Sequence, residues 1–480
     1  MEKKEHHHYK LIDVGTLGGP TSFPPNPYAL DINSCGLAIA EADTSIPDPN
    51  APNCFQKDCL VNHAITWQNG LQKDLGILPG GYGSYPSWSS DQGTVVGWSE
   101  NGVIDPLTGN PEVVAVLWKD GKVFDLGTLG GNASYAQAIN NWGHVVGEAL
   151  NSIPDDFATD LAGPNFPVAT QFRAFLWQDG VMQDLGTLGG NDAVALFVNN
   201  WGQVAGVSYT DTTPNVTTGF PTIAPFFWQN GKMVDIGTLG GTIGYPIWMN
   251  SLGQVTGFSD LAGDGTEHPF LWSKAEGIKD LGTLGGTFGH SDSLNDAGQV
   301  VGTATTSGDQ TGRAFLWRKG VMTDLGTIDA DLDSEAFSIS SQGQIVGTTG
   351  VFGVVDNHAF LWENGGPLVD LATLALPGSD VTVFSAVFIN DQGEIAGSGM
   401  LSNGDVHSVL LTPCDENHPG IEGCDYDEVE APAETPVRSG QIAQAPAVTG
   451  AAKLSVAEMM KRSRLSMANR YRRFGALSLK

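Results

Sequence analysis

Side chains that could take part in chemistry recur at one position of this sequence, five residues before a turn residue that is Asn or Ser. Six of the eight copies carry Tyr, His or Glu there, namely Tyr28, Tyr85, Tyr135, Tyr245, His290 and Glu335. Tyrosine stacks and hydrogen-bonds, whereas His and Glu exchange protons and attract charged groups. We expect this set, here called the mouth residues, to bind a polar ligand. The alternative is that they only pack the start of a strand.

A second group of candidate residues alternates along one short stretch. Asp329, Asp331 and Asp333 replace the Gly-Gly found at this point of other copies of the repeat. Alternating carboxylates in a loop can converge on a hard cation, which makes Ca²⁺ the one candidate cofactor. An EF-hand is excluded because its glycine and terminal Glu are missing. The alternative is a solvated acidic loop. A weaker cluster of the same kind comprises Asp260, Asp264 and Glu267.

Short strands must position these residues. The stretch RAFLWQDGVMQDLGTLGG, residues 173–190, predicts two apolar strands joined by a tight turn at Asp179-Gly180. Asp-Gly tolerates the positive φ angles that two-residue hairpin turns require. A second hairpin, AQAINNWGHVVG at 136–147, has its turn at an Asn followed three residues later by Gly. Each repeat therefore holds four strands.

The number of repeats predicts the architecture. Both hairpins occur eight times, and the turn glycines from Gly36 to Gly393 are about 51 residues apart on average. Four strands at this period predict one blade of a β-propeller. The chain begins with a fourth strand at 9–13 and ends with a third strand at 408–411. Because these partial repeats complement each other, we predict an all-β, eight-bladed propeller of four-stranded blades closed by the N-terminal strand.

The repeats resemble a known family. HAFLWENGG at 358–366, DLGTLGG at 280–286 and the Asn-x-x-Gly-Gln-Val-Val-Gly of 295–302 are similar to the HAF-type extracellular repeat of bacteria. The resemblance covers roughly residues 9–413. It implies secretion and a β-rich repeat fold, and it implies no particular reaction. The chain departs from the pattern at 77–79, and the seventh and eighth copies lose the Gly-Gly.

The sequence predicts four segments. Residues 1–8 form a polar lead or tag, 9–413 the propeller, 414–450 a cysteine loop with an Ala/Pro-rich disordered linker, and 451–480 a short basic amphipathic helix. The tail is expected to dock on its own acidic propeller, or else on a partner or anionic surface. No apolar run reaches membrane-spanning length. The lead lacks a signal core, which indicates that any signal peptide is absent from this chain.

The five cysteines indicate the cellular compartment. Cys54 and Cys59 lie in one insertion, and Cys414 and Cys424 follow the last predicted blade strand. We expect each pair to form a disulfide in an extracellular or periplasmic compartment, which leaves Cys35 over. Cys35 could instead pair with Cys414, and a chain with five reduced thiols is the further alternative.

Charge and motifs set the functional expectation. The chain has 53 acidic and 23 basic residues and a net charge of −30, so the propeller should repel nucleic acid. No nucleophile elbow, zincin motif, phosphate-binding loop or paired-cysteine zinc spacing is present. We therefore predict a secreted, monomeric, non-enzymatic propeller that binds a glycan or protein on its loop-bearing face. The alternative is an enzyme, a hydrolase or lyase acting on extracellular polysaccharide or ester through His290, Glu335 and Tyr245.

Overall fold

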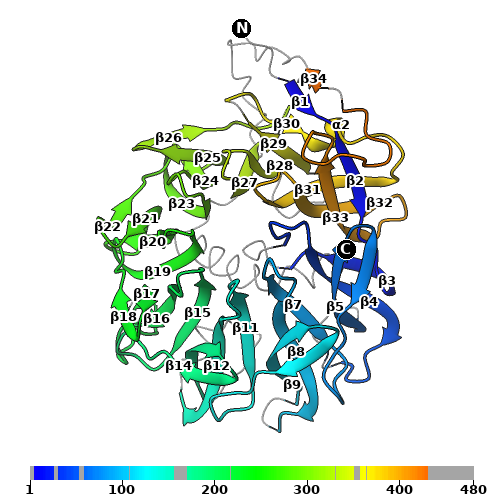
Figure 1. The fold of residues 1–480 in the computed structure, drawn as a ribbon. Helices are drawn as coiled ribbons and strands as arrows, with labels where there is room; N and C mark the ends of the chain where they lie inside the picture. Colours follow the sequence, from blue (N-terminus) through cyan, green and yellow to red (C-terminus); the bar gives the residue numbers. More distant parts are fainter. Residues whose placement is uncertain are drawn as a thin grey trace.

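The protein is an all-β ring of antiparallel meanders (Figure 1). The computed structural model describes residues 5–25, 31–52, 54, 59–106, 109–155, 170–216, 218–329, 331–350, 357–363, 365–426 and 428–430. Within these residues there is one helix, the single turn α2 (Leu371–Leu374). The predicted all-β propeller architecture is confirmed.

The meanders share one order of strands. The first strands, several of which point to the centre of Figure 1, are β3 (Gly18–Phe23), β7 (Ser84–Ser89), β11 (Ser134–Ile139), β15 (Ala193–Val198), β19 (Gly240–Met249), β23 (Gly285–Leu294), β27 (Asp333–Ile339) and β31 (Val381–Ile389). The second strands are β4 (Ala38–Pro47), β8 (Val95–Ile104), β12 (Val145–Pro154), β16 (Val204–Tyr209), β20 (Val255–Leu261), β24 (Val300–Thr306), β28 (Ile345–Gly350) and β32 (Ile395–Leu401).

The outer half of each meander completes it. The third strands are β5 (Leu60–Gln68), β9 (Pro111–Lys119), β13 (Thr170–Gln178), β17 (Ile223–Gln229), β21 (Glu267–Ser273), β25 (Gly312–Arg318), β29 (His358–Trp362) and β33 (Val406–Pro413). The outermost strands are β6 (Leu71–Asp74), β10 (Lys122–Asp125), β14 (Val181–Asp184), β18 (Lys232–Asp235), β22 (Gly277–Asp280), β26 (Val321–Asp324), β30 (Val369–Asp370) and, beside β33, β2 (Tyr9–Asp13).

The outer hairpins turn as the sequence predicts. Asp179 has a φ of 53° and Gly180 a φ of 83°, the left-handed pair that a tight two-residue turn requires. The Asp that ends each outermost strand then fixes the link to the next meander. The Oδ1 atom of Asp184 accepts a hydrogen bond from the Gly186 amide at 2.8 Å, and the other seven copies do the same with the residue two positions on. The Asp of each repeat is therefore structural.

Apolar side chains pack between neighbouring meanders. One cluster joins Val301 and Leu316 of one meander to Ala336, Ile339 and Phe360 of the next. The phenylalanine of the third strand is fully buried in five copies, which are Phe175, Phe226, Phe270, Phe315 and Phe360. Burying such a side chain contributes about 1.5–3 kcal/mol, so the repeated stretch also supplies the core.

The turn asparagines connect the meanders to one another. The side-chain oxygen of Asn140 accepts from the amides of Trp142 and His144, which holds its own turn. Its Nδ2 atom donates to the carbonyl oxygen of Asn199, in the next turn, at 2.9 Å. All six turn asparagines donate in this way over 2.8–3.2 Å; they are Asn33, Asn140, Asn199, Asn250, Asn295 and Asn390.

A bulge with a glycine opposite it shapes seven of the eight innermost strands, all except β3. In β23 the register shifts between Ser291 and Ser293, just after the mouth residue His290. The strand backbone there lies so close to β24 that a Cβ atom on Gly302 would stand 2.2 Å from the His290 carbonyl oxygen. The same contact recurs at Gly97, Gly147, Gly206, Gly257, Gly347 and Gly397. A bulge inserts one extra residue and re-aims a side chain, so this device orients the mouth residues.

The two ends of the chain meet beside β33. Tyr9 to Asp13 pair antiparallel with Pro413 to Val409. Before this, β1 (Glu5–His7) pairs with β34 (Glu428–Glu430), and His6 contacts Glu363 at 2.7 Å. Part of the predicted polar lead is therefore a strand. The predicted linker beyond residue 430 and the predicted helix of 451–480 lie outside the described residues.

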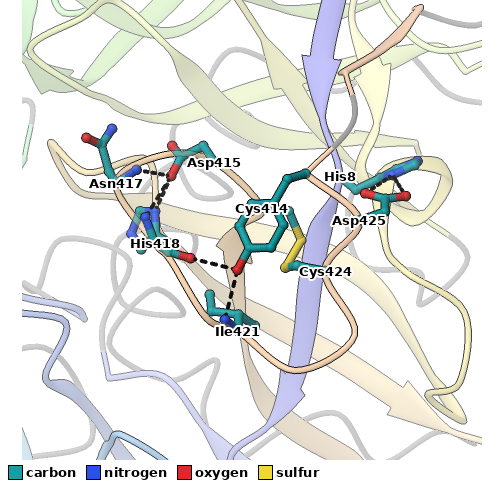
Figure 2. The surroundings of a disulfide bond; sticks show 9 residues. His8, Cys414, Asp415, Asn417, His418, Ile421, Cys424 and Asp425 are labelled. Carbon is teal, nitrogen blue, oxygen red and sulfur yellow. Dashed lines mark hydrogen bonds and ion pairs between the residues drawn. A yellow bond between two sulfur atoms is a disulfide. The ribbon is translucent and has the colours of Figure 1, made fainter.

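Both predicted disulfides are present, Cys54–Cys59 and Cys414–Cys424, and Cys35 is a free, exposed thiol. Figure 2 shows the second disulfide, whose loop is held by the Tyr426 hydroxyl between the His418 carbonyl and the Ile421 amide. The finding excludes the alternative pairing of Cys35 with Cys414.

The loops expected between second and third strands are partly strand. β4, β8 and β12 each run for ten residues, because pairing with the third strand continues past the sheet proper. Pro154 still pairs with Thr170 after a shift of register. No helix among the described residues has the length and apolar character needed to cross a membrane.

Placing a methyl group opposite the bulge should damage the fold. In Gly347→Ala the new Cβ atom would lie 1.9 Å from the Glu335 carbonyl oxygen and 2.7 Å from the Phe360 ring. We expect the free energy of unfolding to fall by about 3 kcal/mol, measured by urea denaturation. The control is Gly265→Ala, whose nearest neighbour is 3.9 Å away. Equal stability of the two variants would contradict the role given to the bulge.

Candidate functional site

The mouth residues lie on neighbouring innermost strands. Tyr85 is on β7, Tyr135 on β11, Tyr245 on β19, His290 on β23 and Glu335 on β27. The four on β7, β11, β19 and β23 are half-buried, and Glu335 is 6% exposed. Tyr28 lies outside the described residues. Tyr85, Tyr135 and Glu335 stand near the start of their strands, whereas Tyr245 and His290 are the sixth residues of β19 and β23. All five follow the link from the previous meander, so they lie toward the loop-bearing side of the ring.

The structure brings His290 and Glu335 together. The Nε2 atom of His290 lies 3.3 Å from Oε1 of Glu335 and 3.5 Å from Oδ2 of Asp292. His290 and Asp292 come from β23, and Glu335 comes from the adjacent β27. The Asp292 side chain is fully buried, and that of Glu335 is 8% exposed. An imidazole thus faces two sheltered carboxylates at the mouth.

Asp292 was missed in the sequence. It stands two residues after the mouth position, where the other repeats carry an uncharged residue. The single carboxylate at an otherwise uncharged position was the signal. Strict alternation would turn Asp292 to the same face as His290, but the bulge that follows Ser291 shifts the register and hides this relationship from the sequence.

A second acidic group lies across the strand from Tyr135. Glu148 of β12 is the cross-strand neighbour of Tyr135. Its two carboxyl oxygens accept hydrogen bonds from the side-chain nitrogen Nε2 of Gln137, at 3.0 and 3.2 Å. Burial raises the pKa of Glu148 to about 8, although the Gln137 hydrogen bonds oppose the rise. The carboxyl group is therefore largely protonated at neutral pH. The sequence signal was its place directly after the strand-two glycine, where copies vary.

Aromatic rings cover the neighbouring part of the mouth. Tyr85 stacks on Trp98 with ring centroids 5.6 Å apart, and Tyr135 meets the edge of Trp98 at 6.4 Å. Burial raises the pKa of both tyrosine hydroxyls, with smaller contributions from Glu41 to Tyr85 and from Glu148 to Tyr135. Both hydroxyls keep their protons and remain hydrogen-bond donors. Flat rings beside donors are suited to the faces and hydroxyls of sugar rings.

Aromatic side chains deeper in the ring contact one another from separate meanders. Trp88 stacks on Trp248 at 5.6 Å, and Trp248 also meets Phe197 at 5.9 Å and Phe388 at 6.0 Å. Each stands three residues after its mouth position, toward the tight turns. This packing favours approach to the mouth from the loop-bearing face. Contacts between such distant repeats are not visible in the sequence.

The predicted calcium ligands have separate partners. Asp331 binds His358 at 3.0 Å and the Thr349 hydroxyl, and Asp333 accepts from the Gly312 amide at 2.8 Å. Asp329 is exposed. Across the described part of the chain, the three-residue group whose donor atoms lie close enough to hold a metal is His290, Asp292 and Glu335. The calcium site on the linker stays a prediction, without a matching cluster in the structure.

The comparisons with known proteins concern the fold alone. No protein-family model matches the chain, so the resemblance to the HAF-type repeat stays a prediction. No curated protein matches it either. The structure is similar to the β-propeller domain of the Trilobed protease from Pyrococcus furiosus, with a TM-score of 0.41, 9% identity, and coverage of 76% of this chain and 98% of that one.

Two further solved structures similar to this chain are named as enzymes. An ulvan lyase of a polysaccharide lyase family has a TM-score of 0.37 and 11% identity over 84% of this chain and 95% of its own. A gluconolactonase from Xanthomonas campestris has a TM-score of 0.27 and 12% identity over 50% of this chain and 78% of its own. Likeness at these values concerns the fold alone.

The predicted non-enzymatic binding function is wrong as the leading interpretation. The similar solved structures that are named for an activity include a peptidase, a hydrazine synthase, a gluconolactonase and a polysaccharide lyase. They do not identify the reaction of this chain. The enzyme alternative must stand on the mouth geometry.

The raised pKa of Glu148 predicts a pH effect on stability. Between about pH 5 and pH 8 the folded chain keeps a proton that an unfolded Glu releases, so the free energy of unfolding falls as pH rises. Glu148→Gln should reduce that fall by roughly 2–4 kcal/mol. Urea denaturation at pH 5 and pH 8 measures it. Asp192→Asn should act similarly, because its pKa is also raised to about 8. An unchanged pH dependence in Glu148→Gln would refute the assignment.

Proposed function

We propose that this chain is an enzyme, a hydrolase or lyase that acts at the mouth on an extracellular polysaccharide or ester. The observation that carries the proposal is the distance of 3.3 Å between Nε2 of His290 and Oε1 of Glu335, with Asp292 beside them. A histidine within reach of a carboxylate is the minimum arrangement for acid–base chemistry. Among the mouth residues that the structure describes, His290 and Glu335 are the one pair in which a histidine lies beside a carboxylate.

The cluster would attract positive charge, as a proton or a cation, to one point of the mouth. Two buried carboxylates stabilise either a proton on the imidazole or a cation bound beside it. Either form activates a water molecule or polarises an oxygen of the substrate. Tyr245, on the neighbouring β19, would supply a hydroxyl toward the same substrate. It stacks on Phe258 at 5.9 Å, which holds its ring in place.

The rest of the mouth supports a polyhydroxylated substrate. Protonated Glu148 and the hydroxyls of Tyr85 and Tyr135 are donors, and Trp98 offers a flat apolar face. A site of this kind binds sugar rings without requiring a charged substrate. The substrate would approach from the loop-bearing face, since aromatic rings pack the turn side.

We propose further that the propeller has eight blades closed by β2, in an oxidising extracellular or periplasmic compartment. Closure is supported by the pairing of β2 with β33 and by the hydrogen bond from Asn390 to the Asn33 carbonyl, which joins residues 357 positions apart. The compartment is supported by the two disulfides. The HAF-type resemblance would agree with secretion.

Substitutions in the cluster should abolish turnover without unfolding the chain. We would incubate the full chain with neutral and acidic polysaccharides and with chromogenic esters, measuring reducing ends, unsaturated products and released chromophore. His290→Gln and Glu335→Gln should each lower kcat/KM by roughly 100-fold or more.

His268→Gln is the matched control, since His268 pairs with Asp280 at 2.8 Å on outer strands. It should keep its activity. A wild-type chain without turnover on any of these substrates would contradict the proposal, as would full activity in both cluster variants.

Closure predicts different effects for two truncations. Removing residues 1–13 deletes β2 and exposes the edge of β33, so the chain should aggregate or lose more than about 10 °C in Tm. Removing residues 1–8 keeps β2 and should cost much less. Light scattering and calorimetry make the comparison. Equal behaviour of the two truncations would contradict closure by β2.

A further inference from the structure

We propose that His290, Asp292 and Glu335 form a binding site for a divalent transition-metal ion, with Zn²⁺ as the preferred ion. This inference deepens the proposed function, because it identifies the positive centre of the mouth. It concerns binding, however, and can be tested without a substrate. The evidence is the spacing of the three donor atoms, the difference between the contacts of His290 and those of the other histidines, and the burial and charge of the cluster.

The spacing of the three donor atoms suits a common central ion. All three lie within 4.8 Å of one another. His290 Nε2 is 3.3 Å from the Glu335 oxygen and 3.5 Å from the Asp292 oxygen. Ligands about 2.0–2.2 Å from a tetrahedral Zn²⁺ are separated from each other by about 3.3–3.6 Å. The two distances from His290 therefore match edges of such a coordination shell.

Other histidines of this protein meet carboxylates differently. Where a ring nitrogen hydrogen-bonds one carboxylate, Nδ1 is used and the distance is 2.6–3.1 Å; these are His6, His8, His63, His268, His358, His407 and His418. His290 instead turns Nε2 toward two carboxylates at once, at longer distances. A hydrogen bond favours one close acceptor, whereas metal ligands surround a shared point.

Burial and charge also favour a cation. The Asp292 side chain is fully buried and that of Glu335 nearly so. Burying two carboxyl groups beside an imidazole costs free energy unless each is protonated or paired with positive charge. A divalent ion would supply that positive charge to both groups at once. The other repeats place no acid at the position of Asp292, so the charge is specific to this pair of blades.

The donor set selects among metals. An imidazole nitrogen with two carboxylate oxygens suits Zn²⁺ and other first-row ions, whereas Ca²⁺ requires six to eight oxygen ligands. Three protein ligands leave a fourth position for water or a substrate oxygen, the arrangement of catalytic rather than structural zinc sites. The site differs in place and chemistry from the calcium site predicted at Asp329, Asp331 and Asp333.

Zinc titration of the full chain tests the inference. The reference protein carries His7→Gln, His8→Gln and Cys35→Ser, which removes two partly exposed histidines and an exposed thiol that could bind Zn²⁺ nonspecifically. After treatment with a chelator and desalting, isothermal titration calorimetry with ZnCl₂ should show one site. Asp292→Asn and Glu335→Gln in the same background should each weaken binding by about 100-fold. His268→Gln removes the imidazole of an ordinary histidine–carboxylate pair and should leave binding unchanged.

Two further readouts keep the result interpretable. Zn²⁺ should raise the Tm of the reference protein and should not raise that of Asp292→Asn. The melting transition of Asp292→Asn without Zn²⁺ shows whether this variant is folded. The inference is overturned if the reference protein binds no Zn²⁺, or if Asp292→Asn and Glu335→Gln bind it as tightly as the reference. A protein that binds Zn²⁺ but turns over nothing keeps the metal site and loses the proposed function. One that turns over substrate without binding Zn²⁺ does the reverse.

Discussion

The hydrogen bond from each turn asparagine to the next turn is the interaction on which the arrangement of the ring depends. One side chain performs two tasks, since its oxygen holds its own turn and its Nδ2 atom reaches the carbonyl oxygen of the neighbouring turn. Apolar packing between sheets is non-directional and tolerates sliding. The asparagine bonds are directional, and they set the spacing of the innermost strands. That spacing allows His290 of one strand to meet Glu335 of the next.

The same repeat separates architecture from chemistry. The terminal Asp of each outer strand and the glycine opposite each bulge perform the same structural task in copy after copy. The bulge then presents the preceding side chain at the mouth, and that position is unconstrained by the repeat. Chemical variety can collect there at little cost to the fold. His290 and Glu335 are such departures. Asp292, two residues after His290, and Glu148, across the strand pair from Tyr135, are departures at neighbouring positions.

Local chemistry explains what the sequence predicts well. The Asp179-Gly180 turn and the short cysteine spacings depend on neighbouring residues, and both are as expected. Joining His290 to Glu335 also follows from the repeat, because equivalent positions in adjacent copies become neighbours in a ring. Asp292 could not be placed, since the bulge breaks the alternation of sides. The stacking of Trp88 on Trp248 joins non-adjacent repeats, which no local pattern reveals. The expectation of a binding protein without activity rested on missing motifs, and sites assembled from several blades have none.

The central claim is that departures from the repeat on two adjacent strands create one metal centre. The most direct measurement is anomalous diffraction from crystals of the full chain grown with zinc, collected on both sides of the zinc absorption edge. The account predicts one strong peak about 2.0–2.2 Å from His290 Nε2 and from oxygens of Asp292 and Glu335. An empty cluster in crystals that bind zinc elsewhere, for example at the N-terminal histidines, would contradict it.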